Sequence, residues 1–370
     1  MSYPILQFGT GRFLQAHVDL FVSEAIAEGK ALGRIAVVQT TDSADSIERV
    51  AALAGGAGHR VEIRGLRDGA TVSETVTVDS IGAAWSAARE WHRVLEAISS
   101  DVQVVISNTA DRGYELSDAD RPDAAPPASF PAKLVVLLHH RWRRMPGAPL
   151  TMYPCELVQR NGDTLREIVA KLASNWHLPD AFVAYVREHC VWVNSLVDRI
   201  VSGALHPVGA IAEPYALWAI EQQDRMILPC EHPSIIVTRE LAKYERLKLM
   251  LLNLGHSVLA ERWLADRRSP DETVRAALSD DRMANELEAV WNGEVLPVFD
   301  AIGEGAAARA YLTQVRDRFR NPFLEHRLAD IANNHVEKKR RRFAPVIELA
   351  ARHGLRIEQP RLRAAMTHAM

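Results

Sequence analysis

The sequence predicts a two-domain α/β protein, in which a mostly parallel sheet with its helices comes first and a mainly α-helical domain follows. The chain opens with an apolar strand that runs into two closely spaced glycines and then directly into a helical pattern. A continuous apolar run at 102–106 is typical of a strand in the centre of a parallel sheet. From Ile235 onward, long helical patterns dominate. We therefore place the boundary near Thr238 and expect domains at 1–238 and 239–370.

The bulk composition fits a soluble globular protein and gives no sign of a polyanionic partner. A chain of 370 residues is long for one core, which favours two domains. Forty-four basic side chains against forty-seven acidic ones give a net charge of -3. Such a balance creates no overall field that would attract nucleic acid or an anionic membrane, so we expect neither as a partner.

The three cysteines and the N-terminal segment indicate a reducing, cytoplasmic location. Cys155, Cys190 and Cys230 are far apart and odd in number, which favours neither a disulfide framework nor a zinc site. The N-terminus enters a strand without a basic and apolar leader, and no apolar run reaches the ~20 residues that span a bilayer. We expect no targeting signal and no membrane segment, and the sequence leaves the oligomeric state open.

The two glycines, Gly9 and Gly11, are candidates for a pyrophosphate cradle. Glycine lets the backbone turn tightly and approach a ligand closely, and the helix that follows offers free N–H groups at its positive end. The third position of the dinucleotide fingerprint is Leu14, where Gly or Ala is usual. On these residues alone, an ordinary strand–turn–helix remains an equal alternative.

A β-α-β unit of the length expected for nucleotide binding surrounds these glycines. Apolar residues from Phe13 to Ile26 recur at helical spacing, and the run 35–38 resumes as a buried strand. At the end of that strand, where an acidic residue often contacts the adenosine ribose, stand Gln39 and two threonines, and Asp42 comes slightly late. Since the sequence shows no basic residue there for a 2′-phosphate, NAD is favoured and NADP stays open.

Asn108 lies just past the carboxyl end of the apolar strand 102–106, where groups line the cofactor crevice of such folds. The polar, Pro-rich segment 111–131 is long for a compact domain, which favours a binding loop or a lid over a plain linker. Short extended pieces at 60–64 and 71–78 predict antiparallel additions to the main sheet. A helix is predicted over 83–98.

The predicted helix 243–256 is mostly apolar, yet it contains Lys248, Asn253 and His256. At the α-helical advance of ~100° per residue, these three side chains share an arc of ~140°. They indicate either an acid/base lysine beside hydrogen-bond donors, or a lysine that reaches solvent beside a satisfied core His and Asn. Asp198 likewise allows two interpretations: it is a site residue, or it forms a buried ion pair with the adjacent Arg199.

The basic run 338–342 could suggest nucleic acid, but these residues fan around most of a helix and the net charge is negative. We interpret the run as a solvated helix face. No H-E-x-x-H or equivalent spacing of histidines occurs, so we expect no metal site.

The spacing Lys-x4-Asn-x2-His at 248–256 resembles the signature of the polyol-specific long-chain dehydrogenases, the mannitol dehydrogenase family. The glycine segment 7–14 looks like the cofactor loop of that family, in which Phe13 accounts for the missing third glycine. Further segments agree in order along nearly the whole chain and resemble the tagaturonate reductase (altronate oxidoreductase) branch, namely 107–109, 154–157 with 161–163, 196–201, and 318–323 to Lys338.

The resemblance implies a Rossmann-type domain and a metal-independent, NAD(P)-dependent oxidoreductase that acts on CH–OH groups. It implies that Lys248 is the general acid/base, that Asn161 and Asn253 stabilise the oxyanion, and that Asp198 and His256 bind substrate hydroxyls. Lys338 matches a lysine near the substrate end, where a cation suits a sugar-acid carboxylate. The cofactor residues that we expect, from the resemblance or from their position, are Gly9, Gly11, Arg12, Phe13, Gln39 and Asn108.

Three functions follow, in order of preference. The first is transfer of hydride between nicotinamide and a sugar acid, from tagaturonate or fructuronate to altronate or mannonate. The second is a polyol dehydrogenase of the mannitol type, acting on neutral ketoses and alditols. The third is a non-catalytic dinucleotide-binding protein that kept the fold.

Overall fold

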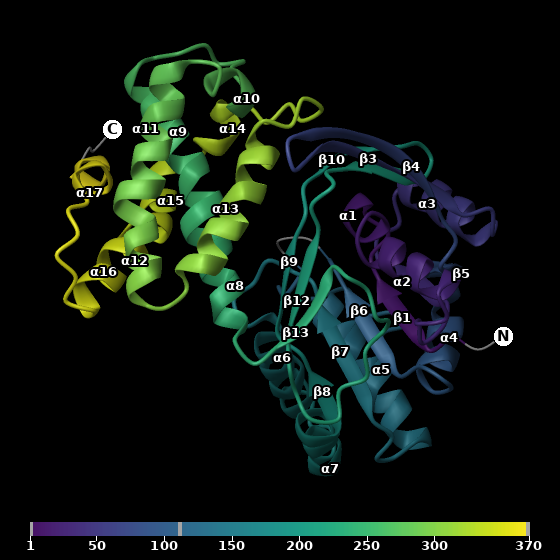
Figure 1. Ribbon diagram of the computed structural model, residues 1–370. Coiled ribbons are helices and arrows are strands. Elements are labelled where there is room, and N and C mark those ends of the chain that lie inside the picture. Colours follow the sequence, from purple (N-terminus) through teal and green to yellow (C-terminus); the bar gives the residue numbers. More distant parts are fainter. Residues whose placement is uncertain (1–2, 110–112, 368–370) are drawn as a thin grey trace. The chain divides into compact units, whose positions relative to one another are not determined.

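The computed structural model describes residues 3–109 and 113–367, which fall into two compact units (Figure 1). Unit 1 consists of Met1–Glu62, Glu74–Ala212 and Ala216–Leu241, and unit 2 consists of Ile63–Ser73, Glu213–Tyr215 and Ala242–Met370. The predicted domains are contiguous at 1–238 and 239–370. The units differ from them in that two short segments of the N-terminal part belong to unit 2.

The centre of unit 1 is a six-stranded parallel sheet with the strand order β5-β2-β1-β6-β7-β8. This sheet and the helices of unit 2 confirm the predicted fold class. The strands are β1 (Ile5–Phe8), β2 (Ile35–Gln39), β5 (Ile81–Ser86), β6 (Val104–Ser107), β7 (Leu150–Pro154) and β8 (Cys190–Trp192).

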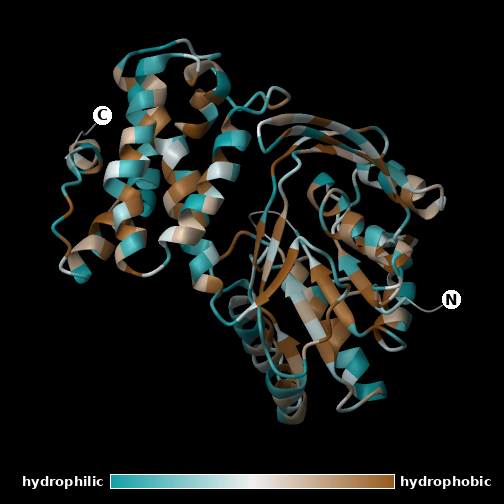
Figure 2. Ribbon diagram, in the orientation of Figure 1, coloured by the Kyte–Doolittle hydropathy of each residue, from teal (hydrophilic) through white to brown (hydrophobic). Residues whose placement is uncertain are grey.

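Both faces of this sheet are buried, which explains why its strands are continuous apolar runs. Leu6 and Phe8 pack on one face, together with residues of α4 (Ala87–Ile98), α5 (Phe130–Arg144) and α6 (Asn161–Asn175). Ile5 and its neighbours pack on the other face, with residues of α2 (Val18–Ala27) and α3 (Ala44–Ala54). Figure 2 shows brown, hydrophobic stretches in these strands at the centre of unit 1.

The helix predicted from Phe13 to Ile26 is interrupted. The structure has α1 (Arg12–Gln15), then Ala16 and His17 outside helical geometry, and then α2. His17 has φ -127° and ψ -91°. Its buried ring lies against Phe21 and Trp218, with ring centroids 4.5 and 5.9 Å away. Helical periodicity continues through the break because the apolar residues on both sides face the same core.

Two smaller sheets correct other predictions. One has the order β10-β11-β3-β4 and the other β13-β12-β9, so the extended pieces at 60–64 and 71–78 do not join the parallel sheet. The first residues of the predicted helix 83–98 belong instead to strand β5, and the helix itself begins only at Ala87. The strands are β3 (His59–Arg67), β4 (Ala70–Val78), β9 (Ser195–Asp198), β10 (Val201–Ala204), β11 (Gly209–Ala212), β12 (Leu217–Glu221) and β13 (Ile235–Thr238).

The remaining helices complete both units. Unit 1 also has α7 (Asp180–Ala184) and the π-helical turn η1 (Tyr185–His189). The helices that follow are α8 (Leu241–Leu247), η2 (Lys248–Asn253), α9 (Leu254–Ala265), α10 (Val274–Ala277), α11 (Asp281–Val290), η3 (Trp291–Val295), α12 (Leu296–Ala301), α13 (Gly305–Phe319), α14 (Leu328–Ile331), α15 (His335–Arg342), α16 (Ala344–Arg352) and α17 (Pro360–Thr367). In the part of the chain that the structure describes, no helix combines the length and apolarity needed to cross a bilayer.

A buried ion pair in unit 2 accounts for part of the motif at 318–322. Arg318 Nη2 lies 2.9 Å from Glu213 Oε1, both side chains are almost fully buried, and the guanidinium stands 4.5 Å from the centre of the Tyr215 ring. Asn321 Nδ2 donates to the carbonyl oxygen of Arg64 at 3.2 Å. The motif therefore holds the two short segments, Ile63–Ser73 and Glu213–Tyr215, against α13.

Candidate active site

Gly9 occupies a position that other residues would strain. Its φ is +120°, and a Cβ atom there would lie 2.6 Å from the carbonyl oxygen of Asn108. The Gly9 amide donates to Val38 O at 3.1 Å, and the Asn108 amide donates to Phe8 O at 3.0 Å. The ends of β1, β2 and β6 thus converge on one glycine.

Gly11 differs from Gly9 because the space above it is open. It precedes α1 with φ -70° and ψ 155°, and a Cβ atom there would meet nothing within 4 Å. The first amides of α1 have no partner within the helix. An exposed glycine before free amides fits a nucleotide pyrophosphate, so these residues could hold the cofactor. Phe13 is half-buried, and its ring stacks on His17 at 4.8 Å.

At the adenosine end of the predicted cofactor site lies a basic residue that the sequence analysis missed. Gln39 is buried, with its Oε1 bonded to the Thr10 hydroxyl and its Nε2 donating to Thr41 Oγ1 at 2.6 Å. Arg49 Nη1 donates to Thr10 Oγ1 at 3.4 Å. The premise that no basic residue lies there is wrong, because α3 brings Arg49 back over the end of β2. The late Asp42 pairs instead with Arg89, at 3.3 Å.

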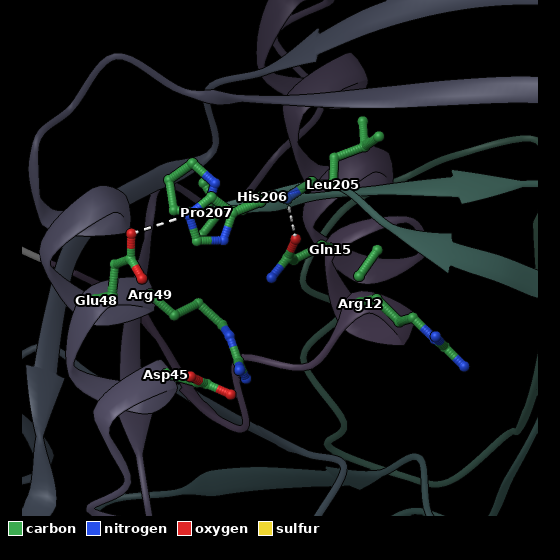
Figure 3. Close-up of a pocket in the computed structure, with 11 residues that line it drawn as sticks. Arg12, Gln15, Asp45, Glu48, Arg49, Leu205, His206 and Pro207 are labelled. Atoms are coloured by element: carbon green, nitrogen blue, oxygen red, sulfur yellow. Dashed lines mark hydrogen bonds and ion pairs between the residues drawn. The ribbon is translucent and has the colours of Figure 1, made fainter.

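A pocket of about 350 Å³ lies beside α1 (Figure 3). Arg12 and Gln15 come from α1, and the opposite wall comes from α3. The turn between β10 and β11 closes the pocket through a bond of 2.7 Å from the Gly209 amide to Gln15 Oε1, and through His206, 3.1 Å from Glu48. The predicted cofactor residue Arg12 therefore lies in a polar pocket. The α3 and turn residues of its lining are Asp45, Glu48, Arg49, Ala204, Leu205, His206, Pro207, Val208 and Gly209.

Glu156 organises the carboxyl ends of β6 and β7. Its carboxylate accepts from Ser107 Oγ at 3.0 Å, from the Thr109 amide and hydroxyl at 3.0 and 2.9 Å, and from the Tyr114 hydroxyl at 3.4 Å. Burial raises the pKa of Glu156, and the hydrogen bonds from Thr109 and Ser107 oppose that shift. Asn108, the predicted cofactor residue between them, donates its Nδ2 to Cys155 O at 3.1 Å. Glu156 received no role in the sequence analysis, although its position two residues past the carboxyl end of β7 indicated a site residue.

The side chain of Asn161, predicted to stabilise the oxyanion, is hydrogen-bonded to the backbone at both ends of its amide. Its Nδ2 donates to the carbonyl oxygens of Pro154, Glu156 and Ser195 at 2.9, 3.1 and 3.0 Å. Its Oδ1 accepts from the amides of Gly162 and Ser195 at 3.0 and 2.9 Å. Both amide hydrogens are therefore engaged within unit 1. The side chain instead fixes the start of β9 against the end of β7.

Asp198 ends β9 and is buried beside the glycine loop. It lies opposite Leu217 in the sheet, and His17 Nε2 is 3.2 Å from Leu217 O. The pKa of His17 is lowered to about 3, mainly by burial, with a smaller contribution from Arg199; the hydrogen bond with Leu217 O and the charge of Asp198 oppose this shift. Arg199 Nη1 donates to Ala16 O at 2.6 Å. Asp198 and Arg199 therefore both belong to the wall behind the break between α1 and α2.

Lys248 and Asn253 are the first and last residues of the π-helical turn η2 in unit 2. The Leu254 amide reaches Leu249 O, five residues back. An i→i+5 register aligns residues five apart, so Lys248 and Asn253 lie closer to one side than the ~140° of an ideal α-helix suggests. Two carbonyls of the turn accept side-chain donors, Leu251 O from Trp291 Nε1 and Asn253 O from Arg342 Nη1, both at 3.1 Å.

His256 follows in α9, where its ring stacks on Phe319 at 4.3 Å and meets His326 edge-on at 4.7 Å. The structure thus brings together the unit 2 candidates Lys248, Asn253 and His256 within one helical segment. Asn161, Asp198 and the cofactor candidates belong to unit 1. No groups of three or more His, Cys, Asp or Glu within 3–109 and 113–367 are placed to hold a metal ion.

The basic run at 338–342 is only partly a solvated face. Lys339 is buried, 2.9 Å from Glu261 Oε2, and Lys338 Nζ donates to Ile331 O at 2.8 Å. Arg342 is half-buried and donates to Ser257 Oγ at 2.8 Å as well as to η2. Arg340 and Arg341 are exposed. The sequence missed Arg342 because its position on α15 shows only in the packed unit.

Family models match almost the whole chain. Residues 3–229 match the mannitol dehydrogenase Rossmann domain, and residues 240–368 match the mannitol dehydrogenase C-terminal domain. The chain belongs to the mannitol dehydrogenase family. The expectation of an oxidoreductase of this family is therefore confirmed, and the Rossmann domain supports a nicotinamide cofactor.

Curated relatives of this family member include altronate oxidoreductases. That of Halalkalibacterium halodurans is 31% identical over 362 residues, which cover 92% of this chain and 69% of the relative. That of Bacillus subtilis is 30% identical, with coverage of 94% and 75%.

Two solved structures share the fold of this family member. Substrate-free D-sorbitol dehydrogenase has a TM-score of 0.84 at 20% identity and covers 99% of this chain and 80% of that chain. Mannitol 2-dehydrogenase of Pseudomonas fluorescens, in a ternary complex with NAD and D-mannitol, has a TM-score of 0.74 at 18% identity, with coverage of 99% and 78%.

The two glycines of the loop should respond differently to alanine. Gly9→Ala forces a Cβ atom against Asn108 O in a backbone conformation that alanine rarely adopts, so the protein should unfold at a lower temperature. Gly11→Ala should leave the melting temperature within about 1 °C, since nothing surrounds its Cβ and its φ is ordinary, but it should weaken NAD(H) binding. Thermal unfolding and fluorescence titration with NADH measure both effects. Normal NADH affinity in Gly11→Ala would contradict the assignment of this loop to pyrophosphate binding.

Asp19, on α2 behind the glycine loop, should make stability depend on pH. Burial raises the pKa of Asp19 to about 7, against a hydrogen bond from Gln7 that lowers it. Between pH 3.8 and 7 the folded protein keeps a proton that the unfolded chain has lost, so stability falls by up to about 1.4 kcal/mol per pH unit as the pH rises.

Asp19→Asn removes this loss, and its melting temperature relative to wild type should therefore rise between pH 5 and pH 8. The exposed Asp101→Asn is the control and should follow wild type. Parallel curves for Asp19→Asn and wild type would show that Asp19 keeps an ordinary pKa.

Proposed function

We propose that this protein interconverts a ketose-type sugar acid and its reduced aldonate with NAD as the cofactor, acting on tagaturonate or fructuronate to give altronate or mannonate. The observation that carries the proposal is the polar side of η2, where Lys248 and Asn253 are aligned by the π-helical register. The names of the two curated relatives, each about 30% identical over more than nine-tenths of this chain, support a sugar acid as the substrate. The cofactor choice is tested with NADPH, because Arg49 lies at the adenosine end.

Lys248 is the acid/base in this proposal. When bound, the nicotinamide would supply the hydride for the carbonyl carbon in the reducing direction and accept the hydride of the carbinol carbon in the oxidising direction. In the reducing direction Lys248, as an ammonium, donates a proton to the forming alkoxide, and in the oxidising direction it takes the proton back. The Asn253 amide stabilises the negative charge that develops on the same oxygen. The half-buried state of both side chains supports this assignment.

The other predicted site residues receive positioning or binding roles. Asn161 positions the start of β9, and through it Asp198, instead of donating to the substrate. Asp198 and His256 bind substrate hydroxyls in the proposal, and the ring contacts of His256 with Phe319 and His326 fix its plane. Gly11, Arg12, Phe13 and Asn108 hold the cofactor, while Gly9 and Gln39 shape the loop that carries it.

The reaction can be tested directly. NADH oxidation is followed with tagaturonate and fructuronate, and with the neutral ketoses tagatose and fructose at the same concentrations. The proposal expects kcat/KM for at least one hexuronate to exceed that for either ketose by at least tenfold. A preference for a neutral ketose would make the protein a polyol dehydrogenase, and NADH binding without turnover of any of the four would favour a non-catalytic role. Repeating the assay with NADPH tests the cofactor.

Lys248→Ala should lower kcat by about 10²- to 10⁴-fold, because general acid/base catalysis contributes about that much. NADH affinity and melting temperature should stay near wild type. Lys243→Ala, on α8 of the same segment, is the matched control and should keep its activity. Turnover that survives in Lys248→Ala, with the wild-type dependence on pH, would rule out the acid/base role.

A further inference from the structure

Three basic side chains of unit 2 gather around the end of η2. Arg342 Nη1 donates to Asn253 O at 3.1 Å and to Ser257 Oγ at 2.8 Å. Lys338 lies one helical turn earlier on α15, on the same side as Arg342. The third is His326, whose ring contacts that of His256 at 4.7 Å. Lys338 and Arg342 both act electrostatically on His326, so the three groups form one cluster.

The two strongest cations of this cluster, Lys338 and Arg342, form no ion pair within the part of the chain that the structure describes. Among the described residues, no carboxylate lies within 4.0 Å of the Lys338 or Arg342 nitrogens. Of the acids nearby, Glu261 pairs with Lys339 and Glu337 pairs with Arg341. The exposed Asp330 acts on His326 through its charge. Two half-buried cations so close together repel each other and have lost part of their hydration, which costs stability unless an anion compensates.

The effect of this crowding is visible in the ionisation of the cluster. Burial lowers the pKa of Arg342 to about 10, with a further contribution from Arg341. Burial, and then the charge of Arg342, also lowers the pKa of Lys338. For His326, burial lowers the pKa first, Asp330 opposes that shift, and Lys338 and Arg342 add to it. Each group carries a less favourable positive charge than it would in water, and a bound carboxylate would relieve all three.

Arg342 is the member best suited to a carboxylate. Both of its bonds to the protein leave from Nη1, and no described residue accepts from its Nε or Nη2. A guanidinium edge held by one nitrogen can present its other donors to both oxygens of a carboxylate. Arg342 is anchored to Asn253, the proposed oxyanion donor, so the anion would bind at a fixed place relative to η2.

We propose that Arg342, with Lys338 and His326, forms the subsite that recognises the carboxylate of the sugar acid and thereby sets the preference for charged over neutral substrates. This inference rests on the proposed function and deepens it, because it names the group that separates a hexuronate from the matching ketose. The adjacent Arg341 takes no part, because it is exposed and pairs with Glu337.

The test compares Arg342→Gln with Arg341→Gln, a matched control on the same helix. KM and kcat are measured with NADH for the preferred hexuronate and for the corresponding neutral ketose. Arg342→Gln should raise KM for the hexuronate about 10- to 100-fold more than KM for the ketose, as expected for the loss of a charge-assisted hydrogen bond to the carboxylate. The loss of its bond to Asn253 O should change kcat for both substrates to the same extent. Lys338→Gln should act in the same direction, and Arg341→Gln should match wild type. Equal changes in KM for both substrates, or an unchanged KM for the hexuronate, would overturn the inference.

A binding experiment separates this inference from the proposed function. Thermal unfolding of the wild-type protein is measured with and without D-gluconate, a sugar acid that needs no turnover. A rise in melting temperature that is lost in Arg342→Gln and kept in Arg341→Gln supports the subsite, even if no hexuronate is reduced and the proposed function fails. Gluconate is added at a concentration that would saturate hexuronate turnover or, if there is no turnover, at up to 50-fold above the protein concentration. If gluconate then leaves the melting temperature of the wild-type protein unchanged, this counts against the subsite even if hexuronates are reduced.

Discussion

The close approach of Gly9 to the end of β6 is the constraint on which the nucleotide side of unit 1 depends. At this point the backbone of β1 leaves the sheet, turns beneath the Asn108 carbonyl and enters α1, and only a residue without a Cβ fits. The same residue bonds to Val38 at the end of β2. Because three parallel strands meet there, the loop, Asn108 and the Gln39 side chain hold fixed positions relative to one another. A cofactor cradle needs this rigidity, since its affinity comes from backbone amides.

Unit 1 surrounds that loop with buried polar groups that have partners inside the protein. Glu156 takes its hydrogen bonds from Ser107, Thr109 and Tyr114, and Asn161 uses both ends of its amide on the backbone. A buried carboxylate or amide is costly unless it is bonded in this way. We therefore interpret these residues as the ones that hold the backbone around the site in place. Their position at the carboxyl edge of the sheet places them where ligands bind in open parallel folds.

Unit 2 contains two kinds of basic side chains, those paired with a carboxylate and those without one. The Arg318–Glu213 pair is buried and matched, and it holds two short segments of the chain against α13. The cluster of Lys338, Arg342 and His326 has no matching carboxylate among the described residues, and it lies next to the π-helical turn that carries Lys248. In a matched buried pair each charge compensates the other, whereas unmatched half-buried charges cost stability and point to a ligand. This contrast, within one unit, separates structural basic residues from those proposed to bind substrate.

The parallel sheet, the glycine loop, the change to helices in the last third of the chain, and the family could all be predicted from the sequence. These features follow from local patterns, namely apolar runs, glycine spacing and helical periodicity, which act over a few residues. The packed structure was needed to show that β3 and β4 belong to a different sheet, that Arg49 lies near the end of β2, and that the Asn161 amide is hydrogen-bonded to the backbone. The same holds for the π-helical register that aligns Lys248 with Asn253, and for the hydrogen bond from Arg342 to Asn253 O. Each of these depends on partners far apart in the chain, and packing selects such partners through shape and charge that no local pattern contains.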